Sequence, residues 1–359
     1  MEMNKIYEER LIEALKMVAP GTRLRQGLED ILRAKTGGLI VVGDSPEVMS
    51  IVEGGFQINT PFSPSFLYEL AKMDGAIILN RDASKILIAN AQLVPAFTIP
   101  STETGIRHRT AERVARQTEE LVISISQRRN VITLYNGFIK YYLRDISVIL
   151  TKANQAIQIL EKYKNVLDRA LNNLSALEYD DLVTVFDVTK VLQRTEMVMN
   201  IVKELEKYIT ELGVEGRLIN MQAEELVVNV EEEGLCVIRD YYQRSLEKKP
   251  EEIMKNLRTW SSEELLELSN IAREMGYTLP HNNVDISVSS RGVRLLHKIP
   301  RLPAQVIDNL LVSFPNFQSI LDASTEELDE VEGIGEVRAR NIKDGLRRLR
   351  EQIFLDRHI

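Results

Sequence analysis

Residues 131–142 read Val-Ile-Thr-Leu-Tyr-Asn-Gly-Phe-Ile-Lys-Tyr-Tyr, two β-rich runs around Asn136-Gly137. This pattern is the strongest short-range signal for a β-hairpin, and it predicts a type I′ turn in which both central residues have positive φ. Toward the N-terminus, short apolar runs predict further buried strands over residues 38–42, 75–79, 86–89 and 121–125. Helical patterns lie between them, over 64–73 and 110–117. The alternation predicts an α/β domain with a mixed sheet over residues 1–145.

The strand signal stops after Arg144. Apolar residues then recur at alternating steps of three and four, which is heptad spacing and predicts a long helix packed against partner helices. The series is Leu150, Ala153, Ile157, Leu160, Leu167, Leu171 and Leu174. Helical patterns follow over 183–212, 215–231 and 235–246, with breaks at Gly213 and Gly216. We expect an all-α middle domain over residues 146–289, with a linker over 270–290. This bundle acts as a spine, or alternatively as a contact between copies along the heptad seam.

The last segment, residues 290–359, is short, helical and repetitive. Residues 298–310 align with residues 330–342 at an offset of 32, so we expect two related helix–turn–helix units. The second unit, residues 331–339, has the apolar-x-Gly-apolar-Gly pattern of a helix–hairpin–helix, in which the glycines let the backbone approach a phosphate. The first unit has Pro300-Arg301-Leu302-Pro303 instead. Because proline has no N–H donor, we expect this unit to be a packing partner.

The glycine-containing hairpin is the candidate DNA-binding element. A hairpin of this kind contacts the phosphate backbone and therefore recognises DNA shape rather than base identity. Cations of the following helix lie where they could neutralise adjacent phosphates. The residues predicted to contact DNA are Gly333, Gly335, Arg338 and Lys343. The alternative is an ordinary αα-turn that ends in a glycine cap.

The chain has 359 residues and a formal net charge of −8. It has no apolar run near the roughly 18–20 residues that a membrane helix needs, and its polar N-terminus shows no signal-peptide pattern. Cys236 is the only cysteine, which excludes an internal disulfide and a cysteine-based zinc cluster. These features predict a cytoplasmic protein with no membrane partner. Because the chain is acidic, contact with DNA requires a local basic patch, such as Arg338, Arg340, Lys343, Arg347, Arg348 and Arg350.

Three short stretches of the first domain carry candidate chemistry. Asp74-Gly75-Ala76 opens a predicted strand, so an acid stands beside a glycine that permits close backbone approach. Residues 105–113 place a glycine turn and several cations at a helix start, and Ser126-Gln127-Arg128-Arg129 follows another strand. Arginines and a helix N-terminus together suit a polyanion, and triphosphate is the obvious candidate. The familiar glycine-rich phosphate loops are missing from the sequence. The alternative is a turn acid and solvated helix charges.

Asp74-Gly75-Ala76 and Arg107-His108-Arg109, followed by a helical middle region and a terminal helix–hairpin–helix, resemble the DNA integrity scanning family of bacterial diadenylate cyclases. Residues 67–73 and 110–113 match as well, and the resemblance covers essentially the whole chain. It implies catalytic roles for Asp74, Arg107, His108 and Arg109. It implies nucleotide contacts from Gly75, Ala76, Leu93, Ile106, Arg107, His108, Arg109, Thr110, Ser126 and Arg129. One position departs from the pattern: the family usually has threonine where this chain has Ile106, and the isoleucine removes a hydroxyl contact to phosphate.

The resemblance implies that two ATP molecules condense into cyclic di-AMP and two pyrophosphates, between protomers that face each other. It implies Mg²⁺ or Mn²⁺ as cofactor, with Asp74 either holding the ion or accepting a proton. It further implies an octamer of two stacked tetramers and binding of branched DNA, such as Holliday junctions, in the nucleoid. One alternative is a nucleotide-sensing protein that binds DNA structures without catalysis. Another is a structure-specific nuclease, which needs a carboxylate cluster that the sequence does not show.

Overall fold

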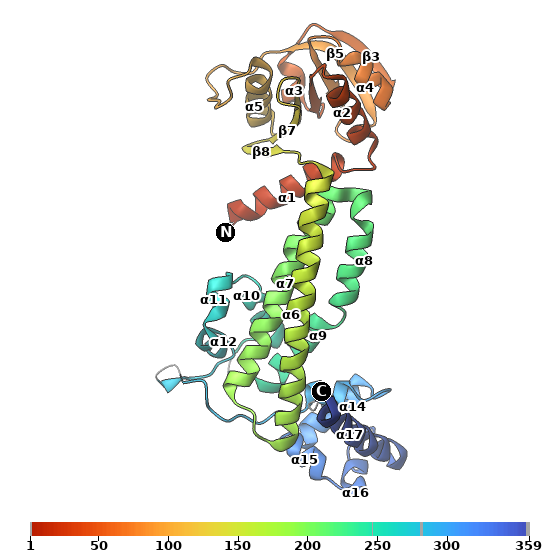
Figure 1. Cartoon of the computed structure of the whole chain (residues 1–359). Coiled ribbons are helices and arrows are strands. Elements are labelled where there is room, and N and C mark those ends of the chain that lie inside the picture. Colours follow the sequence, from red (N-terminus) through yellow and green to blue (C-terminus); the bar gives the residue numbers. More distant parts are fainter. Residues whose placement is uncertain (1, 246, 281–282, 357–359) are drawn as a thin grey trace. The chain divides into compact units, whose positions relative to one another are not determined.

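The computed structural model describes residues 2–245, 247–280 and 283–356 (Figure 1). Its contacts define two compact units, one of Met1–Asn154 with Leu205–Asn220 and one of Gln155–Glu204 with Met221–Ile359. The first unit contains the α/β domain. The second contains most of the long middle helices together with the C-terminal hairpins. Residue 246 of a predicted helix, residues 281–282 of the predicted linker and residues 357–359 lie outside the described residues.

The first unit is built on a mixed sheet, as predicted. Its strands follow the order β2-β5-β4-β1-β6-β7-β8, with β3 paired to β5, and only β1 and β4 are paired in parallel. The four runs predicted as buried strands are β1, β4, β5 and β6. The short β2 and the largely exposed β3, which lack such apolar runs, were not predicted. The bounds are β1 (Gly38–Val42), β2 (Val52–Glu53), β3 (Phe56–Pro61), β4 (Ala76–Leu79), β5 (Lys85–Leu93), β6 (Leu121–Ser126), β7 (Val131–Asn136) and β8 (Ile139–Tyr142).

Helices cover both faces of this sheet because alternate strand residues point to opposite sides. On one face, Ile40 and Val42 of β1 pack with α1, α2 and α4. On the other face, Leu39 and Val41 pack with α3 and α5. Packing on this second face fixes the start of α5 near one end of the strands. The helices are α1 (Glu2–Met17), α2 (Arg23–Ala34), α3 (Pro46–Ser50), α4 (Pro64–Leu70) and α5 (Ile106–Thr118).

The hairpin of β7 and β8 is confirmed, but its turn is not of type I′. Asn136 still belongs to the ladder and pairs with Ile139, so the loop consists of Gly137 and Phe138. Of these two, only Gly137 has positive φ, at 57°. A single positive φ at a first-position glycine is the pattern of a type II′ turn, which also matches the twist of the strands.

The middle of the chain is all-α, as predicted. Its elements are α6 (Ile146–Asp180), α7 (Val185–Leu212), the 3₁₀ turn η1 (Gly213–Gly216), α8 (Arg217–Leu226), α9 (Val230–Tyr241), α10 (Pro250–Leu257), α11 (Ser262–Leu266) and α12 (Leu268–Glu274). Seam residues of α6 such as Leu160 and Leu174 are fully buried within the chain. The seam is therefore not available as a contact between copies, and that alternative is wrong. None of the described helices is long and apolar enough to cross a membrane.

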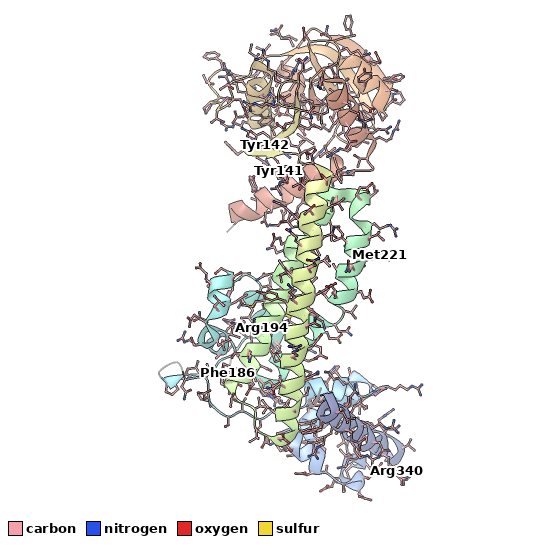
Figure 2. The ribbon with its side chains drawn as sticks, in the orientation of Figure 1. Tyr141, Tyr142, Phe186, Arg194, Met221 and Arg340 are labelled. Carbon is pink, nitrogen blue, oxygen red and sulfur yellow. The ribbon has the colours of Figure 1, made fainter. Side chains whose placement is uncertain are left out.

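Two details correct the expected domain plan. The end of α7 belongs with the first unit, where the hydroxyl of Tyr141 (Figure 2) donates to Oε2 of Glu211 at 2.7 Å. The predicted linker is partly ordered structure, because α12 covers its start and its end pairs with the first residue of α7 and the two residues before it. In that pairing, the N–H of Val185 donates to the carbonyl of Ile286 at 2.9 Å. Backbone pairing of this kind replaces the independent mobility that a linker sequence suggests.

A buried polar network anchors the first C-terminal helix, α13 (Val293–His297), to α6 and α9. Arg294, only 1% exposed, pairs with Glu178 and donates to Oγ of Ser175 at 2.9 Å. Asp240 accepts hydrogen bonds from the N–H groups of Val293 at 2.7 Å and Arg294 at 3.0 Å. Burial raises the pKa of Asp240 to about 7. Because removing one member would strand a buried charge, the network holds α13 firmly within its unit.

Candidate active site and nucleic-acid interface

One edge of the sheet gathers candidate residues from distant parts of the sequence. The parallel register of β1 and β4 places Gly38 and Gly75 level at the starts of these strands. β6 runs antiparallel with Ile125 opposite Gly38, so its end at Ser126 reaches the same edge. Asp74 is exposed there, one residue before Gly75. It makes no hydrogen bond or ion pair with the described residues.

The neighbouring strand β5 completes this edge. Ala76 pairs with Ala91, and the register shifts beside this pair. Asn90 has a positive φ of 53°, and its Oδ1 accepts a hydrogen bond from the N–H of Gly75 at 3.1 Å. A β-carbon at Gly75 would overlap the backbone of Asn90, so the position requires glycine. Asn90 was not predicted from the sequence. Leu93, the last residue of β5, lies beyond this point at the end of the strand.

The first turn of α5 approaches the same edge from the second face. Gly105 is the N-cap with extended backbone, and Ile106 follows with 83% of its surface exposed. A β-carbon at Gly37, where φ is 75°, would overlap Nη1 of Arg107, so this guanidinium lies over the start of β1. Arg107 forms no hydrogen bond or ion pair with any residue that the structure describes. It is therefore available to an anion. Gly37 was not predicted, and the Gly-Gly pair before β1 was its only signal.

Arg109 lies beside the loop that leads into α5. Its Nε and Nη2 donate to the carbonyls of Glu103 and Thr104 at 3.3 and 3.4 Å, near the outer limit for hydrogen bonds. The side chain is exposed. Bonds this long are readily exchanged for a phosphate, so Arg109 stays a candidate for binding the substrate.

Other polar residues of α5 hold the loop that precedes the helix. Glu112, only 4% exposed, accepts hydrogen bonds from Oγ of Ser101 at 2.5 Å and the N–H of Thr102 at 3.0 Å. Nε of Arg113 donates to the carbonyl of Ile99 at 2.9 Å. Arg113, part of the predicted cation cluster, therefore has a structural contact. These bonds define the path of the loop beside the candidate site.

His108 belongs to a partly buried network behind the arginines. Its ring meets that of Tyr135 edge-on at 6.5 Å, and the Tyr135 hydroxyl donates to Glu103 at 2.8 Å. Lys140 forms an ion pair with the same carboxylate at 2.5 Å. Burial raises the pKa of Glu103, but hydrogen bonds from Lys140 and Tyr135 hold it below its ordinary value. Burial lowers the pKa of His108, and nearby cations including Arg129 lower it further. The carboxylate of Glu103 opposes this lowering, but the pKa of His108 stays below its ordinary value, which favours the neutral ring.

The remaining predicted nucleotide contacts occupy different environments. Oγ of Ser126 accepts a hydrogen bond from the N–H of Arg129 at 3.1 Å, and Arg129 itself is exposed. Thr110 is half-buried on α5. Ala76 is only 1% exposed and packs in the core that faces α5. Its side chain is therefore a packing group, and only its backbone could meet a nucleotide.

The metal-binding capacity of this edge rests on one carboxylate. Among the described residues, no three His, Cys, Asp or Glu side chains gather closely enough to hold a metal ion. Asp74 is a single exposed acid. Mg²⁺ commonly binds one or two carboxylates together with water and substrate phosphates. The residues present therefore fit a divalent ion shared with a bound triphosphate.

The C-terminal segment repeats itself at the offset of 32 residues. α13 (Val293–His297) corresponds to α16 (Thr325–Asp329), and the start of α14 (Ala304–Ser313) corresponds to that of α17 (Glu336–Asp356). The intervening α15 spans Phe317–Asp322. Arg301, with φ at 62°, occupies the position of Gly333, with φ at 84°. The two predicted helix–turn–helix units are therefore present, and both turns have a positive φ at the equivalent residue.

The predicted DNA contacts of the second unit differ in availability. A β-carbon at Gly335 would meet no atom within 4 Å, so its backbone is open to a ligand. Nη1 of Arg338 donates to the carbonyl of Gly333, which leaves other donors of its guanidinium. Lys343 donates to two carbonyls at the end of α15, at 2.7 and 2.6 Å. Its ammonium thus supports the fold and is not free to contact DNA, as was predicted for it.

Comparison with known proteins identifies the relatives of this chain. Residues 25–138 match the family described as DisA bacterial checkpoint controller nucleotide-binding, and residues 143–284 match the DisA bacterial checkpoint controller linker region. The DNA integrity scanning protein DisA of Carboxydothermus hydrogenoformans is 64% identical over 96% of this chain and 98% of its own. The protein of the same name from Clostridium botulinum strain Loch Maree is 57% identical over 98% of both chains.

Two solved structures are also similar to parts of the chain. A hypothetical membrane spanning protein from Bacillus cereus is 21% identical over 34% of this chain and 62% of its own, with a TM-score of 0.31. A double mutant of DacA from Staphylococcus aureus is 16% identical over 40% and 91%, with a TM-score of 0.28. The two DisA proteins decide the assignment, because each aligns with nearly the whole chain at more than 50% identity. The chain therefore belongs to the DisA family of bacterial diadenylate cyclases.

Proposed function

We propose that the first domain condenses two ATP molecules into cyclic di-AMP and two pyrophosphates. In each half of the reaction, the 3′-oxygen of one ATP attacks the α-phosphorus of the other. The bond from that phosphorus to the pyrophosphate oxygen breaks, and the hydroxyl proton passes to a base. Because both new bonds join the same two nucleotides, two sites that each hold one ATP must face each other across a two-fold axis.

The observation that carries this proposal is the convergence at one sheet edge. Asp74 is exposed next to Gly75, which precedes β4. At the same edge, the guanidinium of Arg107 lies over Gly37 and has no hydrogen bond or ion pair with the described residues. The small residues let a nucleotide approach the backbone closely. The acid and the cation supply opposite charges to a hydroxyl and a phosphate. This combination suits transfer of a nucleotidyl group better than simple binding.

Each side chain has a separate task in this proposal. Arg107 and Arg109 bind phosphates, since an arginine fork matches phosphate oxygens and stays charged. Asp74 either accepts the proton of the attacking hydroxyl or holds a metal ion. Ser126 and the backbone of Gly75 line the nucleotide. His108, neutral and fixed against Tyr135, orients the first turn of α5.

A divalent ion fits this edge in a limited way. Asp74 would hold Mg²⁺ or Mn²⁺ jointly with substrate oxygens, because the described residues offer no cluster of three ligands. When bound, such an ion offsets the charge of the triphosphate. The arginines are still needed, since one carboxylate and one ion leave most of the phosphate charge unbalanced.

The test is direct. The full-length protein is incubated with ATP and either Mg²⁺ or Mn²⁺, and the products are separated by chromatography. Asp74→Asn should keep the fold and ATP binding, while cyclic di-AMP formation falls by about 100-fold or more. Asp308→Asn, which changes an exposed acid of α14, is the matched control and should retain activity. Normal turnover by folded Asp74→Asn protein would refute the assignment, and ATP binding without product would favour a nucleotide sensor.

We further propose that the second hairpin unit binds branched DNA, such as Holliday junctions, in the cytoplasm and at the nucleoid. The open backbone at Gly335 and the exposed Arg338 support this role. An assembly of several copies, which we propose to be an octamer, would engage several DNA arms at once. The cyclase assay with and without a four-way junction tests whether DNA binding changes activity.

A further inference from the structure

The two hairpin units differ at equivalent places. The second turn is packed against α14: a β-carbon at Gly333 would lie 3.6 Å from Cγ2 of Val306. Nδ2 of Asn309 also donates to the carbonyl of Glu332 at 2.7 Å. The corresponding place at the first turn is open. A hollow of about 500 Å³ lies there, between residues 299–302 and the start of α17.

The charged residues that line this hollow are two arginines and one acid. Arg338 stands at the position equivalent to Val306, and Arg301 stands at the position equivalent to Gly333. The acidic residue of the lining, Glu336, already forms an ion pair along α17. Two like charges that share a hollow repel each other unless an anion lies between them. The hollow therefore matches a negatively charged ligand.

Arg301 is also held in an unusual backbone conformation. Its φ of 62° is a left-handed value that glycine adopts freely and arginine rarely does. Its side chain is exposed and forms no hydrogen bond or ion pair within the described part of the chain. A strained residue without an internal partner points to a role toward an outside molecule.

We infer that this hollow is a second phosphate site for DNA, in which Arg301 and Arg338 bind one backbone phosphate together. Because Pro300 and Pro303 have no backbone N–H, the first turn offers fewer hydrogen-bond donors to a phosphate. The guanidinium of Arg301 supplies N–H donors in their place. The unit expected to be only a packing partner thus becomes a binding element. This inference rests on the proposed DNA binding of the second hairpin.

The test measures binding of the full-length protein to a fluorescently labelled four-way DNA junction over a range of salt concentrations. Arg301→Gly removes the guanidinium and suits the positive φ, so its thermal midpoint should equal or exceed that of the wild type. For each hairpin domain that engages the junction, the slope of log affinity against log salt should fall in magnitude by about 0.9, with affinity about fivefold to tenfold lower near 0.1 M salt. Arg301→Lys is the matched control. It keeps the charge and should retain the slope.

A second comparison tests whether the two arginines share one phosphate. In an Arg338→Ala background, Arg301→Gly should weaken binding clearly less than it does in the wild type. An unchanged salt slope for Arg301→Gly, while wild-type protein binds the junction, would overturn the second site and leave the DNA role of the other hairpin intact. Failure of the wild type to bind the junction would overturn both.

Discussion

Gly75→Ala is the sharpest test of the geometry at the candidate active site. The added β-carbon would overlap the carbonyl carbon of Asn90 and lie 2.7 Å from the nitrogen of Ala91. Ordinary contacts of a β-carbon begin near 3.4 Å. The atoms in conflict are backbone on both sides, so no side chain can rotate away. β4 and β5 must separate, and the hydrogen bond from Gly75 to Asn90 must lengthen.

The size of the effect follows from these contacts. Forcing an extra carbon into a packed place costs about 1–3 kcal/mol, and weakening the hydrogen bond adds about 1 kcal/mol. For a unit of this size, such a loss lowers the thermal midpoint by about 4–16 °C. Asp74 precedes the affected residue and moves with it. Since a misplacement of about 1 Å can reduce turnover about 100-fold, cyclic di-AMP synthesis should fall further than unfolding alone explains.

Gly38→Ala is the matched control, at the same level of the parallel neighbour β1. Its β-carbon would lie 3.5 Å from Cδ1 of Ile40, an ordinary contact, and its φ is not positive. Differential scanning calorimetry should show a midpoint within about 2 °C of wild type. Equal midpoints for Gly75→Ala and Gly38→Ala would refute the strand packing described here. Full activity of Gly75→Ala would refute the placement of the site.

Four further outcomes are expected. Ile106→Thr should leave the thermal midpoint unchanged, because Ile106 is 83% exposed. It should raise cyclic di-AMP synthesis by up to about tenfold to a hundredfold through one new hydrogen bond to phosphate, and lower activity would contradict this. Burial lowers the pKa of His108, so the unfolded chain binds more protons than the folded one below about pH 6.5. Between pH 7 and 5, the free energy of unfolding should therefore fall more for the wild type than for His108→Gln. Light scattering should show that active protein is an oligomer, and an active monomer would exclude the shared-site mechanism. Gly335→Val should weaken junction binding at an unchanged midpoint, since its side chain meets open space.

Much of the fold was predictable because burial leaves a direct pattern in the sequence. β1 is buried at every position and reads as a continuous apolar run. β3 is mostly exposed and ends in Pro61, so it has no such run and was missed. The hairpin turn was displaced by one residue for another reason. Asn136 favours a turn locally, but it pairs with Ile139 in β8 and with Leu121 in the distant strand β6, and this long-range pairing outweighs the local preference.

The candidate site was only partly predictable. Charged motifs identified Asp74 and Arg107, since acids and arginines carry a chemical meaning in any fold. Asn90 and Gly37 were missed because their roles arise from backbone conformation and from contacts across strands. Asn90 becomes important only where the register of β5 shifts. Gly37 matters because Arg107, 70 residues away in sequence, occupies the place of its missing side chain.

The C-terminal basic patch shows how charge in a sequence overstates charge available to DNA. Arg340, labelled in Figure 2, pairs with Glu336, and Arg347 pairs with Asp344. The ammonium of Lys343 donates hydrogen bonds to the carbonyls at the end of α15. Few phosphates can therefore be neutralised by one copy, and the affinity of a single hairpin domain for DNA must be modest. On the proposed DNA binding, tight binding would depend on several copies acting together. The proposed assembly would then serve both DNA binding and the paired sites proposed for cyclic di-AMP synthesis.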